Sequence, residues 1–241
     1  MSLIATDQLR IIIGLGQTGL SCARYLAGRG LSFVLVDTRE VPPNLEQIRD
    51  EFPDAELHCG ALEEALLCQA SEILLSPGVA KDQPAIQAAV AAGVKLSGDI
   101  DLFCQAVSAP IIAISGSNAK STVTTLVGQM ALDAGIDTGI GGNLGTPVLD
   151  MLSAGEQRLY VLELSSFQLE TVNDLRATVA TVLNVSPDHL DRYNNSLQLY
   201  YQAKHRIFKC AGQVVINRDD PLTSPLVSTG VKVSSFGKGR P

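Results

Sequence analysis

Several stretches of the 241-residue sequence carry residues whose type and spacing suit phosphate chemistry. The first is Gly14-Leu-Gly-Gln-Thr-Gly19, a G-x-G-x-x-G pattern between an apolar run at 10–14 and a helix expected at about 19–27. Its first glycine permits a tight turn, and its second lets a diphosphate approach the backbone at a helix N-terminus. Asp37 ends the next apolar run, where an acid often meets a ribose or base. The pattern favours diphosphate binding over a ligand-free turn, and it does not identify the nucleotide.

A second stretch, Ser115-Gly-Ser-Asn-Ala-Lys-Ser-Thr122, resembles a phosphate-binding loop. Such loops direct backbone N–H groups and a lysine at phosphates and place a Ser or Thr hydroxyl on Mg²⁺. The strict pattern G-x-x-x-x-G-K-[ST] fails, because Ile114 and Ala119 stand where its two glycines belong. The apolar run before the loop and the expected helix after it favour phosphate binding over a serine-rich helix cap with a solvated lysine.

Three further candidates are weaker when each is taken alone. Glu163 ends an expected strand and suits either an Mg²⁺ ligand or an exposed carboxylate, and composition does not separate the two. The run Asp188-His-Leu-Asp-Arg192 offers an imidazole that can ligate a metal or orient a reactant, although, taken singly, a structural turn is the favoured interpretation. Lys204 lies in an expected helix and, at face value, is a solvated lysine.

The elements that must position these residues alternate between apolar runs and amphipathic segments. Strands are expected at 10–14, 33–37, 54–60, 72–76, 110–115, 159–163, 179–184, 213–217 and 232–236. Helices are expected at about 19–27, 83–92, 121–134 and 197–208. This alternation predicts an α/β protein with parallel sheets, and a break near Lys95–Gly98 predicts two domains, 1–98 and 99–241.

Composition excludes several classes of protein. The net charge of −7 has no basic stripe, which argues against a nucleic-acid-binding surface. No apolar run approaches the ~20 residues of a membrane span, and Met1–Arg10 does not read as a signal peptide. The five cysteines form no Cys-x-x-Cys pair, which favours free thiols in a reducing cytoplasm.

Taken together, these segments resemble the Mur ligases. The matching pieces are GLGQTGLS, VDTR, LSPG, SGDIDLF, GSNAKSTVTTLVG, GGNLGTP, YVLELSSFQLE, LNVSPDHLDRY and AKHRIF. They run in family order from residue 10 to about residue 209, and their combination is specific although no single piece is. VDTR, SPG and SGDIDLF suit the member of the family that adds glutamate.

The resemblance implies a role for each matched residue. UDP-substrate contacts would come from Gln17, Thr18, Asp37, Thr38, Arg39, Ser76, Pro77, Gly78, Asn143 and Ser165. ATP contacts would come from Gly116, Ser117, Asn118, Ala119, Lys120, Ser121 and Thr122. Magnesium ligands would be Ser121, Glu163, His189 and Lys204, the last after carbamylation, and the catalytic set would be Lys120, His189 and Lys204.

The resemblance also implies a fold and an activity. It predicts a Rossmann-like N-terminal domain and a P-loop-type central ATPase domain, incomplete here, with the C-terminal domain of the family absent. The activity would be ATP-dependent ligation of D-glutamate to UDP-N-acetylmuramoyl-L-alanine through an acyl phosphate, with two Mg²⁺ ions. Because that third domain is missing, we expect the chain alone to be inactive. We expect a cytoplasmic monomer that binds neither nucleic acid nor membrane.

One departure and three alternatives accompany this interpretation. Ala119 replaces the glycine of the family loop, and if that position requires a positive φ, its Cβ costs roughly 1–2 kcal/mol. An NAD-dependent oxidoreductase would explain the first glycine motif and leave GSNAKST and LELSSFQLE without a purpose. A non-catalytic UDP-sugar-binding fragment is the second alternative. A folylpolyglutamate synthetase, the third, would not need the N-terminal uridine site.

Overall fold

A computed structural model describes residues 8–226 and 228–239 of the chain. Residues 1–7, which bear on the signal-peptide prediction, lie outside the described part. The chain divides into two compact units, the first ending at Leu102 and the second beginning at Phe103. The boundary expected at residue 98 lies just before this division, and each unit is best understood by itself.

The first unit is built on a five-stranded sheet in the order β3-β2-β1-β4-β5, with every pair parallel. Its strands are β1 (Arg10–Ile13), β2 (Phe33–Asp37), β3 (Leu57–Cys59), β4 (Glu72–Leu75) and β5 (Lys95–Ser97). The three isoleucines of β1 are fully buried, as a central strand covered on both faces requires. The predicted break is wrong at Lys95–Ser97, because this short polar segment pairs with β4.

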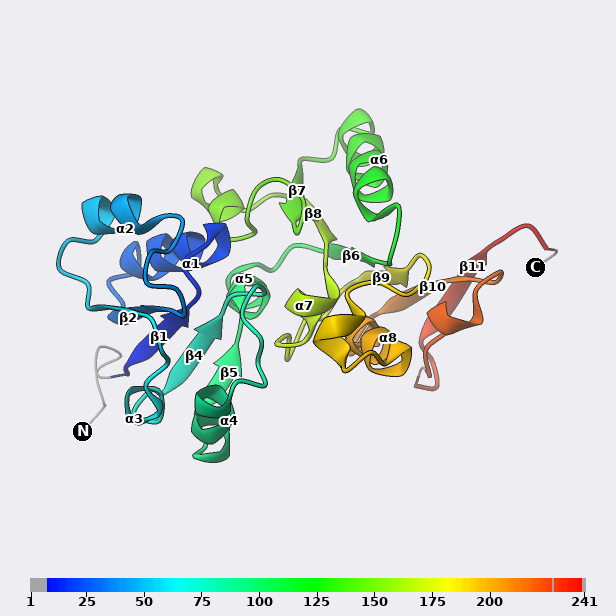
Figure 1. Cartoon of the computed structure of the whole chain (residues 1–241). Helices are drawn as coiled ribbons and strands as arrows, with labels where there is room; N and C mark the ends of the chain where they lie inside the picture. Colours follow the sequence, from blue (N-terminus) through cyan, green and yellow to red (C-terminus); the bar gives the residue numbers. More distant parts are fainter. Residues whose placement is uncertain (1–7, 227, 240–241) are drawn as a thin grey trace. The chain divides into compact units, whose positions relative to one another are not determined.

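Helices cover both faces of this first sheet. They are α1 (Gln17–Ala27), α2 (Leu45–Glu51), α3 (Glu64–Leu67) and α4 (Pro84–Ala91), and α5 (Asp99–Ala106) spans the division between the units. Figure 1 shows α1 and α2 on one face and α3 and α4 on the other. The chain leaves β1 towards one edge and returns at β4 on the opposite side of β1. In such sheets ligands bind at the carboxyl ends of the strands, where this switch occurs.

The second unit holds a six-stranded parallel sheet in the order β11-β10-β9-β6-β8-β7. Its strands are β6 (Ile111–Ser115), β7 (Thr138–Gly142), β8 (Leu159–Glu163), β9 (Val179–Val182), β10 (Gln213–Asn217) and β11 (Lys232–Phe236). The α/β prediction with parallel sheets is confirmed in both units. β7 was not predicted, because its sequence TGIGG is rich in glycine, which strands disfavour.

Helices also lie on both faces of the second sheet. They are α6 (Lys120–Asp133), α7 (Ser166–Leu169) and α8 (Leu197–His205), with short 3₁₀ turns η2 (Asp150–Ala154), η3 (Leu190–Tyr193), η4 (Arg206–Phe208) and η5 (Pro221–Thr223). Figure 1 shows α6 on one face and α7 and α8 on the other. None of the helices in the described part of the chain has the length and apolar character needed to cross a bilayer.

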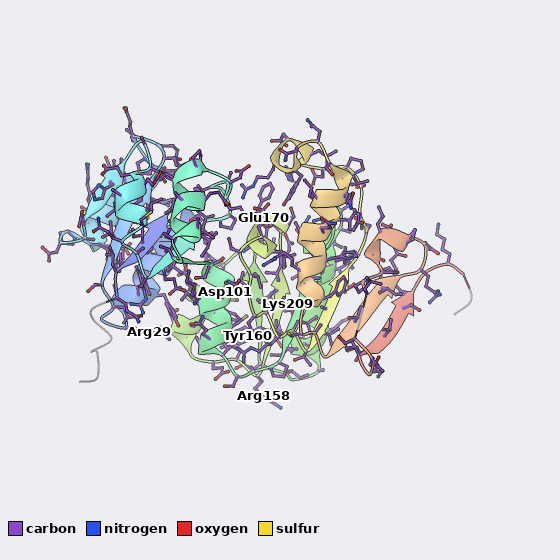
Figure 2. All side chains as sticks on the ribbon, turned by 90° about the horizontal axis from the view of Figure 1, so that it is seen from below. Arg29, Asp101, Arg158, Tyr160, Glu170 and Lys209 are labelled. Atoms are coloured by element: carbon purple, nitrogen blue, oxygen red, sulfur yellow. The ribbon has the colours of Figure 1, made fainter. Side chains whose placement is uncertain are left out.

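The two ends of β8 have different surroundings: the amino end packs in an apolar core, and the carboxyl end lies among the candidate site residues. Tyr160, near its amino end, is fully buried and packs edge-on against Phe103, with ring centroids 4.8 Å apart. Figure 2 shows Arg158 and Tyr160 on the opposite side of the unit from Glu170, which follows the carboxyl end of the strand and α7. The candidate residues for ATP and metal follow the carboxyl ends of β6, β8 and β9, so the fold gathers them at one edge.

Candidate functional site

The glycine-rich turn between β1 and α1 uses its three glycines differently. Gly14 has φ +93°, and a Cβ on Gly19 would lie 2.0 Å from the Gly14 carbonyl oxygen, so both are required by the fold. A Cβ on Gly16 would meet no protein atom within 4 Å. The space above Gly16 is therefore open, as close approach of a diphosphate to the backbone requires.

Asp37 locks this turn from the end of β2. Its side chain is 1 % exposed and accepts hydrogen bonds from the Leu15 N–H at Oδ2 (2.7 Å) and from the Arg39 N–H at Oδ1 (2.9 Å). The Arg39 guanidinium adds bonds of 2.8 Å to Oδ1 and 2.6 Å to Oδ2. Burial by itself would raise the pKa of Asp37, but the hydrogen bonds from Arg39 and Leu15 outweigh it and lower that pKa. The carboxylate thus holds the turn and orients the half-exposed Arg39.

The other UDP-site candidates of the first unit surround the same turn. Ser76 Oγ donates to the Gly14 carbonyl at 2.6 Å, and Gln17 Nε2 donates to Asn44 Oδ1 at 3.5 Å. Asn44 in turn donates to the Leu15 carbonyl at 3.2 Å. Thr38 follows the carboxyl end of β2, and Pro77 and Gly78 follow that of β4, so the predicted set lies at one edge of the sheet.

The phosphate loop joins β6 to α6, and its strained residue is Ala119. Ala119 has φ 63° and ψ 8°, the left-handed conformation that glycine would adopt without penalty. The condition stated for this position, a positive φ, is therefore met, and the Cβ of Ala119 carries the corresponding cost. The first amide bonded within α6 is that of Val123, which donates to the Ala119 carbonyl at 3.0 Å. The amides of Lys120, Ser121 and Thr122 precede it and form the positive end of the helix.

Lys204 is buried in the second unit, so the solvated reading of this residue is wrong. It is 1 % exposed, its Nζ donates to the Gly116 carbonyl at 2.8 Å, and the same Nζ lies 4.6 Å from the centroid of the Tyr200 ring. Burial, and next the nearby charge of Lys120, lower the pKa of Lys204 to about 7. The sequence did contain a signal, because Tyr200, Ala203 and Lys204 share one face of α8 and all three are buried.

Lys120, the first residue of α6, contacts the same loop as Lys204 of α8. Its Nζ donates to the Ser117 carbonyl at 3.1 Å, next in sequence to the carbonyl that Lys204 contacts. Two amines therefore meet consecutive peptide groups of the loop, and the charge on Lys120 disfavours protonation of Lys204. The pair forms a locally electropositive patch that suits phosphate oxygens.

Glu163 is buried at the carboxyl end of β8, which rules out the exposed-carboxylate reading. It is 2 % exposed, and Asn143 holds it twice: Asn143 Nδ2 donates to Oε1 at 2.6 Å, and the Asn143 N–H donates to the Glu163 carbonyl at 2.8 Å. The second carboxylate oxygen, Oε2, is buried without a hydrogen-bond partner among the described residues. An orphaned buried carboxylate oxygen fits a cation ligand, since an unpaired buried charge is otherwise costly.

His189 and its neighbours form a separate polar turn. His189 has φ 49°, its side chain is 58 % exposed, and its Nε2 lies 3.6 Å from Asp188 Oδ2. Its ring centroid is 5.2 Å from that of Phe167, which follows β8. In the described part of the chain, no hydrogen bond or ion pair joins His189 to Glu163 or Lys204. The geometry therefore connects Lys120 to Lys204 and Asn143 to Glu163, and it leaves His189 outside these contacts.

The donor set as a whole suits a metal that phosphate oxygens help to bind. Within residues 8–226 and 228–239, no group of three or more His, Cys, Asp or Glu side chains is arranged to hold a metal ion. The predicted set draws on one hydroxyl, one carboxylate, one imidazole and one lysine, at Ser121, Glu163, His189 and Lys204. Mg²⁺ usually keeps few protein ligands and relies on substrate phosphates, so this sparse set is compatible with it.

Two residues that hold the phosphate loop were not recognised from the sequence. Asn184 and Ser186 contact Asn118 and Ser117 through side-chain hydrogen bonds of 2.8–3.1 Å. Their spacing of two, directly after an apolar strand, was the available signal. Ser165, predicted to contact substrate, caps α7 by accepting a 3.1 Å bond from the Gln168 N–H.

Comparisons with known proteins are consistent with this geometry. The chain is 58% identical over 241 residues to a UDP-N-acetylmuramoylalanine–D-glutamate ligase of Pseudomonas fluorescens, and 57% identical over 241 residues to that of Pseudomonas aeruginosa. It is 49% identical over 240 residues to that of Marinobacter nauticus. In each case the chain covers 53% of the relative, so it spans about half the length of the curated relatives it matches.

Solved structures share the fold. A UDP-N-acetylmuramate:L-alanyl-gamma-D-glutamyl-meso-diaminopimelate ligase from Neisseria meningitides aligns with 95% of this chain and 77% of its own, with a TM-score of 0.59 and 16% identity. The UDP-N-acetylmuramate-alanine ligase from Thermotoga maritima aligns with 97% of this chain and 53% of its own, with a TM-score of 0.52 and 19% identity. At these identities the likeness concerns the fold alone.

Two family matches cover most of the sequence in consecutive segments. Residues 8–98 match the N-terminal domain described as Mur ligase MurD-like. Residues 114–241 match the Mur ligase middle domain, which covers the phosphate loop, Glu163, His189 and Lys204. Neither the oxidoreductase nor the folylpolyglutamate alternative receives support from these matches. The chain belongs to the Mur ligase family.

Proposed function

We propose that the enzyme of which this chain forms part joins D-glutamate to UDP-N-acetylmuramoyl-L-alanine at the expense of ATP. The observation that carries the proposal is a pair of amines, the partly buried Lys120 and the buried Lys204, that contact the phosphate loop of a Mur ligase middle domain. The glutamate specificity rests on the names of relatives that are 49–58% identical to the chain. Residues 1–98 would hold the UDP substrate, and residues 99–241 would hold ATP.

The chemistry follows from the poor electrophilicity of a carboxylate. The alanyl carboxylate oxygen attacks the γ-phosphorus of ATP, the bond to ADP breaks, and an acyl phosphate forms. The amine of D-glutamate then attacks the carbonyl carbon, gives up a proton, and phosphate leaves. The Lys120 amine and the first amides of α6 would stabilise the phosphate oxygens in both steps.

Magnesium ions, when bound, would neutralise the crowded phosphate and carboxylate oxygens. Ser121, Glu163, His189 and a modified Lys204 would hold them. Glu163 supports this role because Asn143 binds one carboxylate oxygen and leaves the other, Oε2, orphaned. An anionic form of Lys204 would add a second negatively charged protein ligand to Glu163, beside the substrate phosphates on which Mg²⁺ relies.

Carbamylation of Lys204 would supply that anion. A pKa lowered to about 7 leaves much of the amine neutral at physiological pH. The neutral Nζ can attack the carbon of CO₂, so that a C–N bond forms and the departing proton goes to solvent. The product is an anion beside Lys120, whose positive charge would stabilise it where it destabilises an ammonium.

The first unit is proposed to bind the UDP end. Gln17 and Thr18 would contact the diphosphate at the start of α1, above the open space at Gly16. Arg39, oriented by Asp37, and Thr38 would frame the uracil, with Ser76, Pro77 and Gly78 alongside. Asn143 and Ser165 of the second unit would contact the muramoyl-alanine end. We further propose a cytoplasmic monomer.

Calorimetric titration of the chain tests this proposal directly. UDP-N-acetylmuramoyl-L-alanine should bind, UDP-N-acetylmuramic acid should bind more weakly, and NADH should give no heat. The Gly16→Val variant should lose the UDP ligand while keeping its fold, because a Cβ at this position meets no protein atom within 4 Å. Equal affinity for the two UDP ligands would refute the glutamate-adding assignment, and unchanged affinity in Gly16→Val would refute the location of the diphosphate.

A further inference from the structure

The segment that follows β9 continues alongside the phosphate loop after the regular ladder ends. The last ladder partners are Ser115 and Val182. Beyond them the Leu183 N–H donates to the Ser115 carbonyl at 2.9 Å, and the Ser117 N–H donates to the Asn184 carbonyl at 3.0 Å. The loop is therefore not suspended between β6 and α6, because a neighbouring strand exit supports it.

Beyond these two bonds, the hydrogen bonds to the loop involve side chains instead of joining backbone groups on both segments. Asn184 Oδ1 accepts from the Asn118 N–H at 2.8 Å, and Asn184 Nδ2 donates to the Asn118 carbonyl at 3.1 Å. One side-chain amide thus satisfies both peptide groups of Asn118, as a paired strand would. The Ser186 N–H donates to Ser117 Oγ at 2.9 Å, and that hydroxyl lies 2.9 Å from the Ser186 carbonyl. We call Asn184 and Ser186 the loop clamp.

The loop clamp is itself fixed from its other side. Asn217 Nδ2, at the end of β10, donates to the Leu183 carbonyl at 3.0 Å. The Val185 N–H donates to Asp220 Oδ2 at 2.7 Å. Residues 184 and 186 therefore face the loop while residue 185 faces the exit of β10. This double attachment restricts the positions that the Asn184 amide can take.

One feature of the loop opposes its observed conformation. Ala119, directly after Asn118, occupies the left-handed region with φ 63°. The amines of Lys120 and Lys204 hold the preceding part of the loop through hydrogen bonds to the carbonyls of residues 117 and 116, and neither contacts Asn118 in these bonds. The loop clamp counteracts the strain through neutral groups, so it adds no negative charge that would compete with phosphate oxygens for Lys120.

We propose that Asn184 is a positioning residue that holds the phosphate loop in its nucleotide-binding conformation against the strain at Ala119. The nucleotide part of this inference rests on the proposed function, whereas the clamping part does not. Asn184 would act through Asn118 and would leave the amides of residues 120–122, at the start of α6, directed at the phosphates.

The test compares Asn184→Ala and Asn184→Asp with the control Asn173→Ala. Asn173 makes a 3.0 Å side-chain bond to the Thr171 carbonyl, away from the loop. Hydrogen exchange of the loop amides at residues 117–121, measured without nucleotide, should accelerate about tenfold in Asn184→Ala and stay unchanged in the control. Asn184→Asp keeps the shape and the acceptor oxygen but loses the donor to the Asn118 carbonyl. Its loop exchange can therefore be measured even if the alanine variant fails to fold.

Titration with Mg²⁺ and the β,γ-imido analogue of ATP gives the second readout. We expect about tenfold weaker binding in Asn184→Ala, from the loss of two hydrogen bonds. Adding Ala119→Gly should restore affinity more in that background than in the wild type, because glycine keeps the left-handed conformation without a clamp. Unchanged exchange and unchanged affinity in both Asn184 variants would overturn the proposal. A wild-type chain that fails to bind the analogue would instead count against the proposed function, and loop exchange would still decide the clamp.

Discussion

The two units each present a strand-to-helix turn to a proposed phosphate, and they stabilise it by opposite means. In the first unit glycines occupy the strained and crowded positions, at Gly14 and Gly19, and a buried carboxylate, Asp37, holds the turn. In the second unit an alanine occupies the left-handed position, neutral side chains hold the loop, and two lysines line it. The supporting side chain is therefore negatively charged in the first turn and neutral in the second.

This difference matches the ligands proposed for the two turns. A diphosphate whose nucleoside and sugar make further contacts can be held by backbone amides and an arginine, so the acid at Asp37 can serve structure. A triphosphate that undergoes reaction carries more charge, and it needs a loop whose supporting side chains add no negative charge of their own. The neutral clamp at Asn184 satisfies that need. The comparison predicts that substitutions at equivalent places in the two turns act differently.

The largest expected effect is a difference in stability between substitutions at two glycines of the first turn. Gly19→Ala should destabilise the first unit by about 3 kcal/mol or unfold it, because the new Cβ would lie 2.0 Å from a backbone oxygen. Gly16→Val should change the free energy of unfolding by less than about 1 kcal/mol, because that position has an extended backbone and open space around it. Thermal denaturation of both variants measures this contrast, and equal destabilisation would show that the turn is purely structural.

The next effect concerns Lys204 and depends on pH. Between a folded pKa of about 7 and the ordinary value of 10.5, the unfolded chain holds the proton and the folded chain does not, so stability rises with pH in this window. Below pH 7 both states are protonated, and the penalty of burial is complete. In CO₂-free buffer at pH 6.5, Lys204→Met should therefore be more stable than the wild type by about 2 kcal/mol.

That advantage of Lys204→Met should shrink as the pH rises towards 10, because the buried amine of the wild type is then neutral. Urea denaturation at several pH values provides the measurement. Lys209→Met is the control, since Lys209 is exposed on the segment after α8 and is labelled in Figure 2. A constant difference between Lys204→Met and the wild type across this range would contradict the burial penalty.

Ala119→Gly should stabilise the second unit by about 1 kcal/mol. Glycine removes the Cβ conflict at φ 63°, and its greater freedom in the unfolded chain offsets part of that gain. Ala134→Gly is the matched control at the opposite end of α6, where φ is −80°. It should destabilise by up to about 1 kcal/mol. Chemical denaturation of both variants should give changes of opposite sign, and a loss of stability in both would argue against strain at Ala119.

The smallest effect is expected at Asp37 in acid. Its pKa is lowered in the fold, so its contribution to stability is complete above the unfolded carboxyl pKa of about 4 and is lost as the pH falls through the folded pKa. The net effect is small because burial opposes the hydrogen bonds from Arg39 and Leu15. Asp37→Asn should flatten this part of the acid-denaturation curve, whereas Asn at the exposed Asp54 should leave it unchanged.

Apolar runs predicted most of the strands, whereas short polar or glycine-rich strands escaped prediction. β1, β2, β4, β6, β8, β10 and β11 lie at or within one residue of their expected positions, because β-branched runs next to turns are distinctive. β5 and β7 were missed because KLS and TGIGG have no apolar period, and only pairing with β4 and β8 makes them strands. Helix α8 was predicted, but the side of the helix on which Lys204 lies was not recognised.

The sequence by itself determined the two turns, the alternation that makes parallel sheets, and the family, because these depend on neighbouring residues and their order. Only the tertiary structure decided which charges are buried. Composition leaves Glu163 open between a metal ligand and an exposed carboxylate, and Lys204 reads at face value as a solvated lysine, yet both side chains are buried in the second unit. The loop clamp likewise joins residues 66 positions apart, at Asn118 and Asn184. Burial and long-range pairing depend on the packing of distant segments, which no local pattern in the chain contains.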